Sequence, residues 1–291
     1  MFDQLPREQV RTLLQLAIAE DIPSGDVTSE SIGLAPQNSR GEIVAKQSAV
    51  VCGLPVLQEL AALMSPELHL HAEVSEGAYV GVGERVAVCR DSLKDLLAFE
   101  RTALNLLQHL SGIATHVRGL VEQVSALELL DTRKTTPGYR VLEKYAVRVG
   151  GGQNHRMSLS DQVLIKDNHI DGAGVSGGEL VRRCRSIAPP GIPIEIEVRS
   201  FEELEEVLAS KPDIVLLDNM PFETLDRSIA YIRSLFPQLP IEISGNITKK
   251  RFGELEELAQ QYGHLRASMG NLTYGAGWID FSLKIQIQAD E

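Results

Sequence analysis

The chain has 291 residues, 43% of them apolar, and a formal net charge of −12. That length and apolar content suit one large α/β domain or two smaller ones and argue against disorder. The acidic balance argues against a nucleic-acid partner. The absence of a long apolar run, and of a signal peptide in MFDQLPREQ, predicts a cytoplasmic protein with no membrane partner. The cysteines Cys52, Cys89 and Cys184 are far apart, which predicts buried thiols and neither a disulfide framework nor a zinc site.

The first part of the chain predicts a lead-in helix and a small α+β domain. Apolar residues recur at helical spacing over 6–20, and the turn-rich EDIPSGDVTSE follows. Strand-like runs then occur in GEIVAKQSAVVCG, ELHLHAEV and GERVAVCR, with an apolar helix near 55–64 between the first two. His69 and His71 share one face of the second run. Because no third ligand is nearby, we interpret them as a solvated strand face and not as a metal pair.

A long helix is predicted over 92–126 from a stripe of leucine and alanine residues. The stripe is interrupted at Ser111-Gly112, and we place a domain boundary there. The predicted organisation is an N-terminal domain over 1–111, a C-terminal domain over 112–275 and a terminal segment over 276–291. On the helix pattern alone, Glu100 and Arg101 are interpreted as a surface ion pair.

The second half of the chain alternates between short apolar strands and helices. Strands are predicted in LELLD, VLIKD, IEIEV, IVLLD, IEISG and LRASMG, and helical segments follow the first five of them. Such alternation indicates a parallel sheet with helical crossovers. Six or so units predict an open α/β barrel with fewer than the usual eight strands.

Polar groups follow each of these strands at its carboxyl end. In α/β barrels these ends meet at one mouth, which is where active sites lie, so the groups are predicted to converge. They are Thr132, Arg133 and Lys134; Lys166; Glu197; Asp218; Ser244, Gly245 and Asn246; and Ser268, Met269 and Gly270.

The segment from Asp131 to Ile170 is a basic island in an acidic chain. It holds seven Lys or Arg residues against four acids, and a glycine triplet that leads into Asn154, His155 and Arg156. Cations and backbone N–H groups brought together in this way indicate a pocket for a small anion.

Two strands carry further chemical signals. Glu195 and Glu197 face the same side of IEIEV, where Lys166 or a bound Mg²⁺ would satisfy them, and a structural Glu–Lys pair is an equal alternative. Ser244–Thr248 ends one strand and opens a helix, so its N–H groups suit a phosphate. The arrangement recurs at Ser268–Asn271.

The motifs DTRKTTPG, LEKYAV, GGGxNHR, LIKDNH, LLDNM, EISGNIT and SMGNLT, in this order and spacing, resemble the quinolinate phosphoribosyltransferase family. EDIPSGDVTSE and ERTALNLLQHLSGIAT extend the resemblance over nearly the whole chain. It implies an N-terminal α/β sandwich domain and a C-terminal incomplete α/β barrel. It also implies transfer of phosphoribose from phosphoribosyl pyrophosphate to quinolinate with decarboxylation, a step of NAD biosynthesis that needs Mg²⁺ and no organic cofactor.

By the same resemblance, the quinolinate carboxylates would be held by Arg133, His155 and Arg156. Lys134 and Lys166 would lie where the two substrates meet. Of these five residues, the two lysines would be catalytic.

The resemblance also assigns the other substrate. Glu197 and Asp218 would be catalytic carboxylates near the ribose hydroxyls and Mg²⁺, in direct or indirect contact with the ion. Ser244–Asn246 and Ser268–Gly270 would form phosphate loops. Arg101 would be supplied in trans by a partner subunit, which replaces its interpretation as a surface ion pair and implies a homodimer or a hexamer of dimers.

The end of the chain departs from the family pattern. After SMGNLT the family continues with His-Ser, where this chain has Tyr274-Gly275, so a histidine contact to phosphate is missing or replaced. The following 278–287 alternates with period two and predicts a strand that returns to the N-terminal domain.

Two other readings stay open on the residues themselves. An aldolase-like barrel would use Lys166 as a Schiff-base lysine. A paralogue of the family would bind a related ligand without catalysis or act on a different acceptor. The paired phosphate loops count against the first reading. The complete block from Arg133 to Lys166 counts against a loss of activity in the second.

Overall fold

The computed structural model describes residues 2–34 and 37–287, and the chain separates into two compact units. Unit 1 consists of residues 1–119, 135–151 and 272–291, and unit 2 of residues 120–134 and 152–271. The α/β class and the N-terminal sheet domain are as predicted. In the described part of the chain, no helix is long and apolar enough to cross a membrane.

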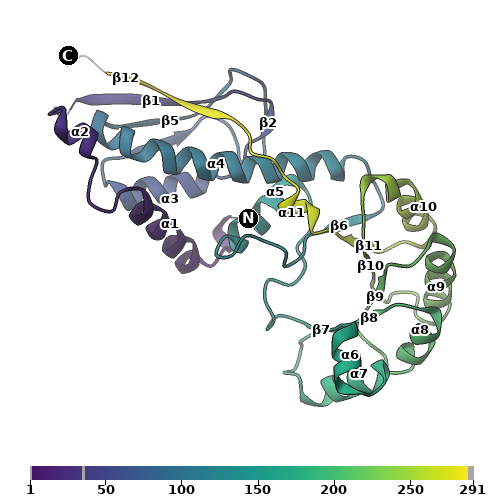
Figure 1. Cartoon of the computed structure of the whole chain (residues 1–291). Coiled ribbons are helices and arrows are strands. Elements are labelled where there is room, and N and C mark those ends of the chain that lie inside the picture. Colours follow the sequence, from purple (N-terminus) through teal and green to yellow (C-terminus); the bar gives the residue numbers. More distant parts are fainter. Residues whose placement is uncertain (1, 35–36, 288–291) are drawn as a thin grey trace. The chain divides into compact units, whose positions relative to one another are not determined.

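Unit 1 is built on an antiparallel sheet in the order β12-β1-β5-β3, with a separate β2-β4 pair. In Figure 1 the yellow β12 runs beside β1. Its strands are β1 (Asn38–Ala45), β2 (Ala49–Val50), β3 (His69–Ala72), β4 (Tyr79–Val80), β5 (Arg85–Ser92) and β12 (Phe281–Ile287). Its helices are η1 (Phe2–Gln4), α1 (Arg7–Asp21), α2 (Val27–Ser31), α3 (Leu54–Met64) and α5 (Arg140–Gly150), with most of α4 (Leu93–Val121) and of α11 (Asn271–Tyr274).

The helix α4 is the central element of unit 1, and its apolar side chains, including Leu107, Leu110 and Ile113, are fully buried. The helix runs unbroken through Ser111 and Gly112, in agreement with the long helix predicted over 92–126. Gly112 has a packing role instead: a Cβ there would lie 2.0 Å from the carbonyl oxygen of Gly277. The missing side chain therefore lets the returning C-terminal segment cross the helix.

Unit 2 contains a parallel six-stranded sheet in the order β6-β11-β10-β9-β8-β7. Strands β6 and β7 lie at opposite edges, which is the open barrel that the sequence predicts. The strands are β6 (Glu128–Leu130), β7 (Val163–Ile165), β8 (Ile194–Val198), β9 (Ile214–Asp218), β10 (Ile241–Ser244) and β11 (Leu265–Ser268).

Helices connect these strands, and α7 to α10 follow one another along the curved sheet in Figure 1. They are α6 (Asp167–Ala173), α7 (Gly177–Ile187), α8 (Phe201–Leu208), α9 (Phe222–Leu235), η2 (Lys249–Arg251) and α10 (Phe252–Tyr262). Helix α6 was not predicted from the sequence, because DNHIDGA is short and lacks an apolar stripe.

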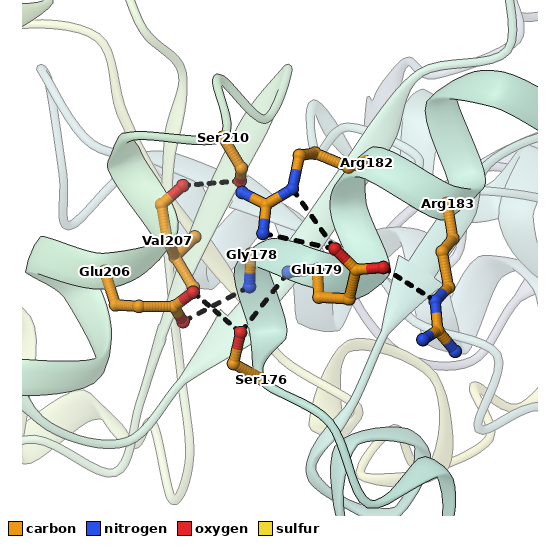
Figure 2. Close-up of polar contacts among 8 residues, drawn as sticks. All are labelled: Ser176, Gly178, Glu179, Arg182, Arg183, Glu206, Val207 and Ser210. Atoms are coloured by element: carbon orange, nitrogen blue, oxygen red, sulfur yellow. Dashed lines mark hydrogen bonds and ion pairs between the residues drawn. The ribbon is translucent and has the colours of Figure 1, made fainter.

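Polar contacts connect the start of α7 to α8. Ser176 caps α7 by accepting from the Glu179 N–H, and its hydroxyl donates to the Glu206 carboxylate of α8 at 2.8 Å (Figure 2). Glu179 in turn accepts from Arg182 and Arg183. These ion pairs are exposed and lie within α7 itself, so they add little to stability.

Candidate functional site

The carboxyl ends of the strands in unit 2 enclose a pocket of about 240 Å³. This pocket brings together nine of the residues singled out in the sequence, whereas Asp218, Gly245, Asn246, Met269 and Gly270 are not among the residues that line it. Its lining consists of Thr132, Arg133, Lys134, His155, Arg156, Leu164, Lys166, Glu197, Leu216, Glu242, Ser244 and Ser268.

The cationic side of the pocket begins where β6 ends. Thr132 shapes the turn, since its hydroxyl oxygen accepts from the Lys134 N–H at 3.0 Å. The guanidinium of Arg156 donates to the Gln162 carbonyl at 3.0 Å. Burial lowers the pKa of Arg156, and the nearby charge of Arg133 lowers it further. Two arginines that repel one another beside a pocket form a site suited to an anion.

His155 lies at the buried end of the pocket and is held by acids. Its backbone N–H donates to Asp131 at 2.9 Å, and its Nε2 lies 3.3 Å from an oxygen of Glu195 and 3.3 Å from one of Glu242. Both glutamates are almost fully buried, with side-chain exposures of 0% and 1%. Carboxylate oxygens only accept, so Nε2 carries a proton.

The charge of the imidazole is set by competing contacts. The Arg156 N–H points at Nδ1, 2.6 Å away, and favours the neutral ring. Burial also lowers the pKa of His155, but the hydrogen bonds and charges of Glu195 and Glu242 outweigh burial and raise this pKa from 6.5 to about 9. His155 is therefore an imidazolium at neutral pH and adds to the positive charge of the pocket.

The sequence pattern suggested Lys166 or Mg²⁺ as the partner of Glu195. Of the two, Lys166 was wrong, because Glu195 accepts from Gln162 and lies against His155. Glu242 was missed, although it alternates with isoleucine in IEIS as Glu195 does in IEIEV, and that signal would have found it.

The atoms of His155, Glu195 and Glu242 are close enough together to hold a metal ion. Their charges are already balanced without one, because the imidazolium contacts both carboxylates and the Arg266 guanidinium lies 3.8 Å from Glu242. We therefore assign this cluster to the scaffold of the pocket.

Glu197 lies at the tip of β8, and Asp218 at the tip of the adjacent β9. Burial, and after it the charge of Asp218, raise the pKa of Glu197 against an opposing effect of Lys166, and the resulting pKa is about 6. Two carboxylates that repel one another at a pocket rim suit a cation such as Mg²⁺, whose preferred ligands are oxygens.

The loops after β10 and β11 contain the predicted phosphate loops. Gly245 and Asn246 have left-handed backbone, with φ of 89° and 50°. Helix α10 begins only at Phe252, after a 3-10 turn, and the helix that follows Ser268–Gly270 has four residues. Any phosphate binding there depends on loop N–H groups more than on a helix dipole, which was the sequence argument.

The remaining predicted residues are placed as follows. Met269 is 4% exposed and its N–H donates to the Leu130 carbonyl at 2.8 Å, so it fixes the loop after β11, which Gly270 continues. Arg101 is an exposed residue of α4 in unit 1. Tyr274, also in unit 1, is 67% exposed.

Comparison with known proteins covers both parts of the chain. The family model described as quinolinate phosphoribosyl transferase, N-terminal domain, matches residues 26–111, and the model of the C-terminal domain matches residues 113–284. These matches agree with the resemblance seen in the motifs.

Full-length relatives show the same similarity. A protein of Synechocystis, named as a probable nicotinate-nucleotide pyrophosphorylase [carboxylating], is 39% identical over 94% of this chain and 91% of its own. One of Bacillus subtilis with the same name is 36% identical over 96% and 94%. The solved nicotinate-nucleotide pyrophosphorylase of Francisella tularensis superposes with a TM-score of 0.89 at 33% identity, over 97% of this chain and 98% of its own.

Proposed function

Because the chain belongs to the quinolinate phosphoribosyl transferase family, we propose that it transfers phosphoribose from phosphoribosyl pyrophosphate to quinolinate with decarboxylation. The products are nicotinate mononucleotide, pyrophosphate and CO₂, and the enzyme is a pentosyltransferase of NAD biosynthesis. The observation that carries the proposal is the pocket at the strand tips, which joins a cationic side to the carboxylate of Glu197, and the charge of Asp218 acts on that carboxylate.

The cationic side is the proposed site for quinolinate. Arg133 and Arg156 have the planar donor groups that bind carboxylates in two-pronged fashion, and the imidazolium of His155 adds a third charge. Two carboxylates on neighbouring ring carbons would balance the charges of the two guanidinium groups. Held in this way, the pyridine nitrogen is directed toward the ribose C1.

The carboxylate side is the proposed site for phosphoribosyl pyrophosphate. Glu197 and Asp218 face the ribose hydroxyls, and they are also the residues that would hold Mg²⁺, directly or through water. The ion would neutralise the leaving pyrophosphate. The phosphate ends are assigned to Ser244, Gly245 and Asn246 and to Ser268 and Gly270.

The proposed reaction uses charge more than proton transfer. The ring nitrogen bonds to the ribose C1 as the bond from C1 to pyrophosphate breaks, with Lys134 and Lys166 stabilising the leaving group. Glu197 and Asp218 stabilise the positive charge that develops on the ribose. When the adjacent carboxylate leaves as CO₂, its bonding pair stays on the ring carbon, where the alkylated, positively charged nitrogen stabilises it, and this pair then takes up a proton.

A homodimer, or a hexamer built of dimers, is part of the proposal. Arg101 is exposed in the single chain, as is required of a residue that a partner subunit supplies to the site. Sedimentation that shows a fully active monomer would contradict it. A cytoplasmic location also stays a prediction, which cell fractionation would test.

The function is tested by incubating the purified protein with quinolinate, phosphoribosyl pyrophosphate and Mg²⁺. Nicotinate mononucleotide and CO₂ are expected in equal amounts, and chelation of Mg²⁺ should stop the reaction. A parallel reaction with nicotinate tests acceptor choice, because nicotinate lacks one of the two carboxylates. Turnover of nicotinate in place of quinolinate would overturn the assignment.

A further inference from the structure

Asn219 connects two functional strand tips. Its side-chain Nδ2 donates to an oxygen of Asp218 at 2.6 Å, and its Oδ1 accepts from the Asn246 side chain at 3.2 Å. Its backbone N–H donates to the Ser244 carbonyl at 3.0 Å. One residue thus makes contact with a carboxylate at the tip of β9 and with both ends of the loop after β10.

The backbone at this point restricts which residues are tolerated. Asn219 has a φ of 53°, in the left-handed region that asparagine, aspartate and glycine tolerate best. Its side chain also fills the space that a side chain at position 245 would need. A Cβ on Gly245 would lie 2.2 Å from the Asn219 Oδ1 and 2.7 Å from its backbone nitrogen.

Only asparagine meets all of these demands. Aspartate has the same shape but cannot donate to Asp218, and it would place a second carboxylate against the first. Glycine keeps the backbone conformation but removes both side-chain hydrogen bonds.

We propose that Asn219 is a positioning residue that fixes the Asp218 carboxylate relative to the Ser244–Asn246 loop, and thereby sets the ribose and phosphate contacts of phosphoribosyl pyrophosphate. The inference rests on the proposed function, in which Asp218 faces the ribose and the loop faces phosphate. Because the contacts of Asn219 are on the β9 and β10 side of the pocket, the cationic side at Arg133 and Arg156 is independent of it.

The test compares Asn219→Gly and Asn219→Asp with a matched control. Lys211→Gly places glycine at another left-handed position of the same unit, with φ of 54°, in the exposed turn before β9. Equilibrium binding of quinolinate and of phosphoribosyl pyrophosphate with Mg²⁺ is measured separately for each protein, together with kcat, both KM values and thermal unfolding.

Loss of two hydrogen bonds predicts that Asn219→Gly binds phosphoribosyl pyrophosphate about tenfold more weakly, with a matching rise in its KM. Asn219→Asp should be affected at least as much, because of the added charge. Quinolinate binding should stay within about twofold of wild type in both variants, and Lys211→Gly should match wild type throughout.

Two results would overturn the inference. One is unchanged binding of phosphoribosyl pyrophosphate in both Asn219 variants. The other is an equal loss of both ligands together with a lowered unfolding temperature, which would make Asn219 a merely structural residue. A wild-type protein that does not form nicotinate mononucleotide would instead refute the proposed function, and the direct binding measurements would still test Asn219.

Discussion

Replacing Glu195 by glutamine is expected to lower the pKa of His155. The imidazole Nε2 is 3.3 Å from one oxygen of each of two buried glutamates, Glu195 and Glu242. The substitution keeps the shape of the side chain and its contact with Gln162, but removes one of the two negative charges. His155 would then be held as an imidazolium by a single carboxylate.

The size of the effect follows from the geometry. Burial opposes the charge, yet the pKa of His155 rises from 6.5 to about 9, a net stabilisation of the imidazolium by about 3 kcal/mol. The two carboxylates are equally distant from Nε2, and both raise the pKa of His155. Without the charge of Glu195 this pKa should therefore fall back toward its ordinary value of 6.5.

The assay is an NMR titration of the histidine side chains, with His155 assigned by substitution. Quinolinate binding is measured over the same pH range. Wild type should retain its affinity up to about pH 9, where the imidazolium is lost. The variant should lose affinity at a lower pH, because its His155 becomes neutral earlier.

Glu256→Gln is the matched control. Glu256 is a carboxylate of the same unit that accepts backbone N–H groups from Ala126 and Leu127, and it does not line the pocket. Its replacement should leave the pKa of His155 unchanged. A pKa of His155 in Glu195→Gln within a few tenths of wild type would refute the proposed role of the glutamates.

Three further predictions concern other residues. Arg133→Ala should lower kcat/KM at least about a hundredfold, or about 3 kcal/mol, through loss of a carboxylate contact. Replacement of the exposed Arg183 by alanine should leave kcat/KM unchanged. Near-normal turnover by Arg133→Ala would remove Arg133 from the site. Activity should fall as the pH drops through about 6, because Glu197 becomes protonated and loses its negative charge; a rate profile flat through that range would contradict its role. Burial raises the pKa of Glu256, but its hydrogen bonds outweigh burial and lower this pKa from 4.5 to about 2, so the stabilisation that they give is complete above pH 4.5 and is lost as the pH falls toward 2. Glu256→Gln should therefore lower the unfolding free energy, measured by denaturant titration, by about 2 kcal/mol at neutral pH and by less in acid. A variant as stable as wild type at neutral pH would contradict this role of Glu256.

Much of unit 2 could be predicted from the sequence, because its signals are local. Short apolar strands alternate with amphipathic helices, and the carboxyl ends of parallel strands must meet at one edge. Residues as far apart as Arg133, Lys166 and Ser268 were therefore predicted to share a pocket, and they do. The motif resemblance, confirmed by the comparisons, added the chemistry of the ligands.

Other features depend on contacts between segments that are distant in the sequence. The pattern of Ser111-Gly112 indicated only an interruption of the apolar stripe, whereas in the folded chain the glycine serves the close passage of Gly277. Alternation showed that Glu195 faces inward, but its pairing with His155 depends on the conformation of the loop that precedes β7 and contains His155.

The identities of the residues at the strand tips, and the edge on which they gather, were thus present in the order of the amino acids, since alternation and strand direction follow from local backbone geometry. Which oxygen faces which nitrogen was decided only in the folded chain. Asn219 shows the reason: its partners Ser244 and Asn246 come from another strand, and the left-handed backbone that aims its amide at them is held by that packing.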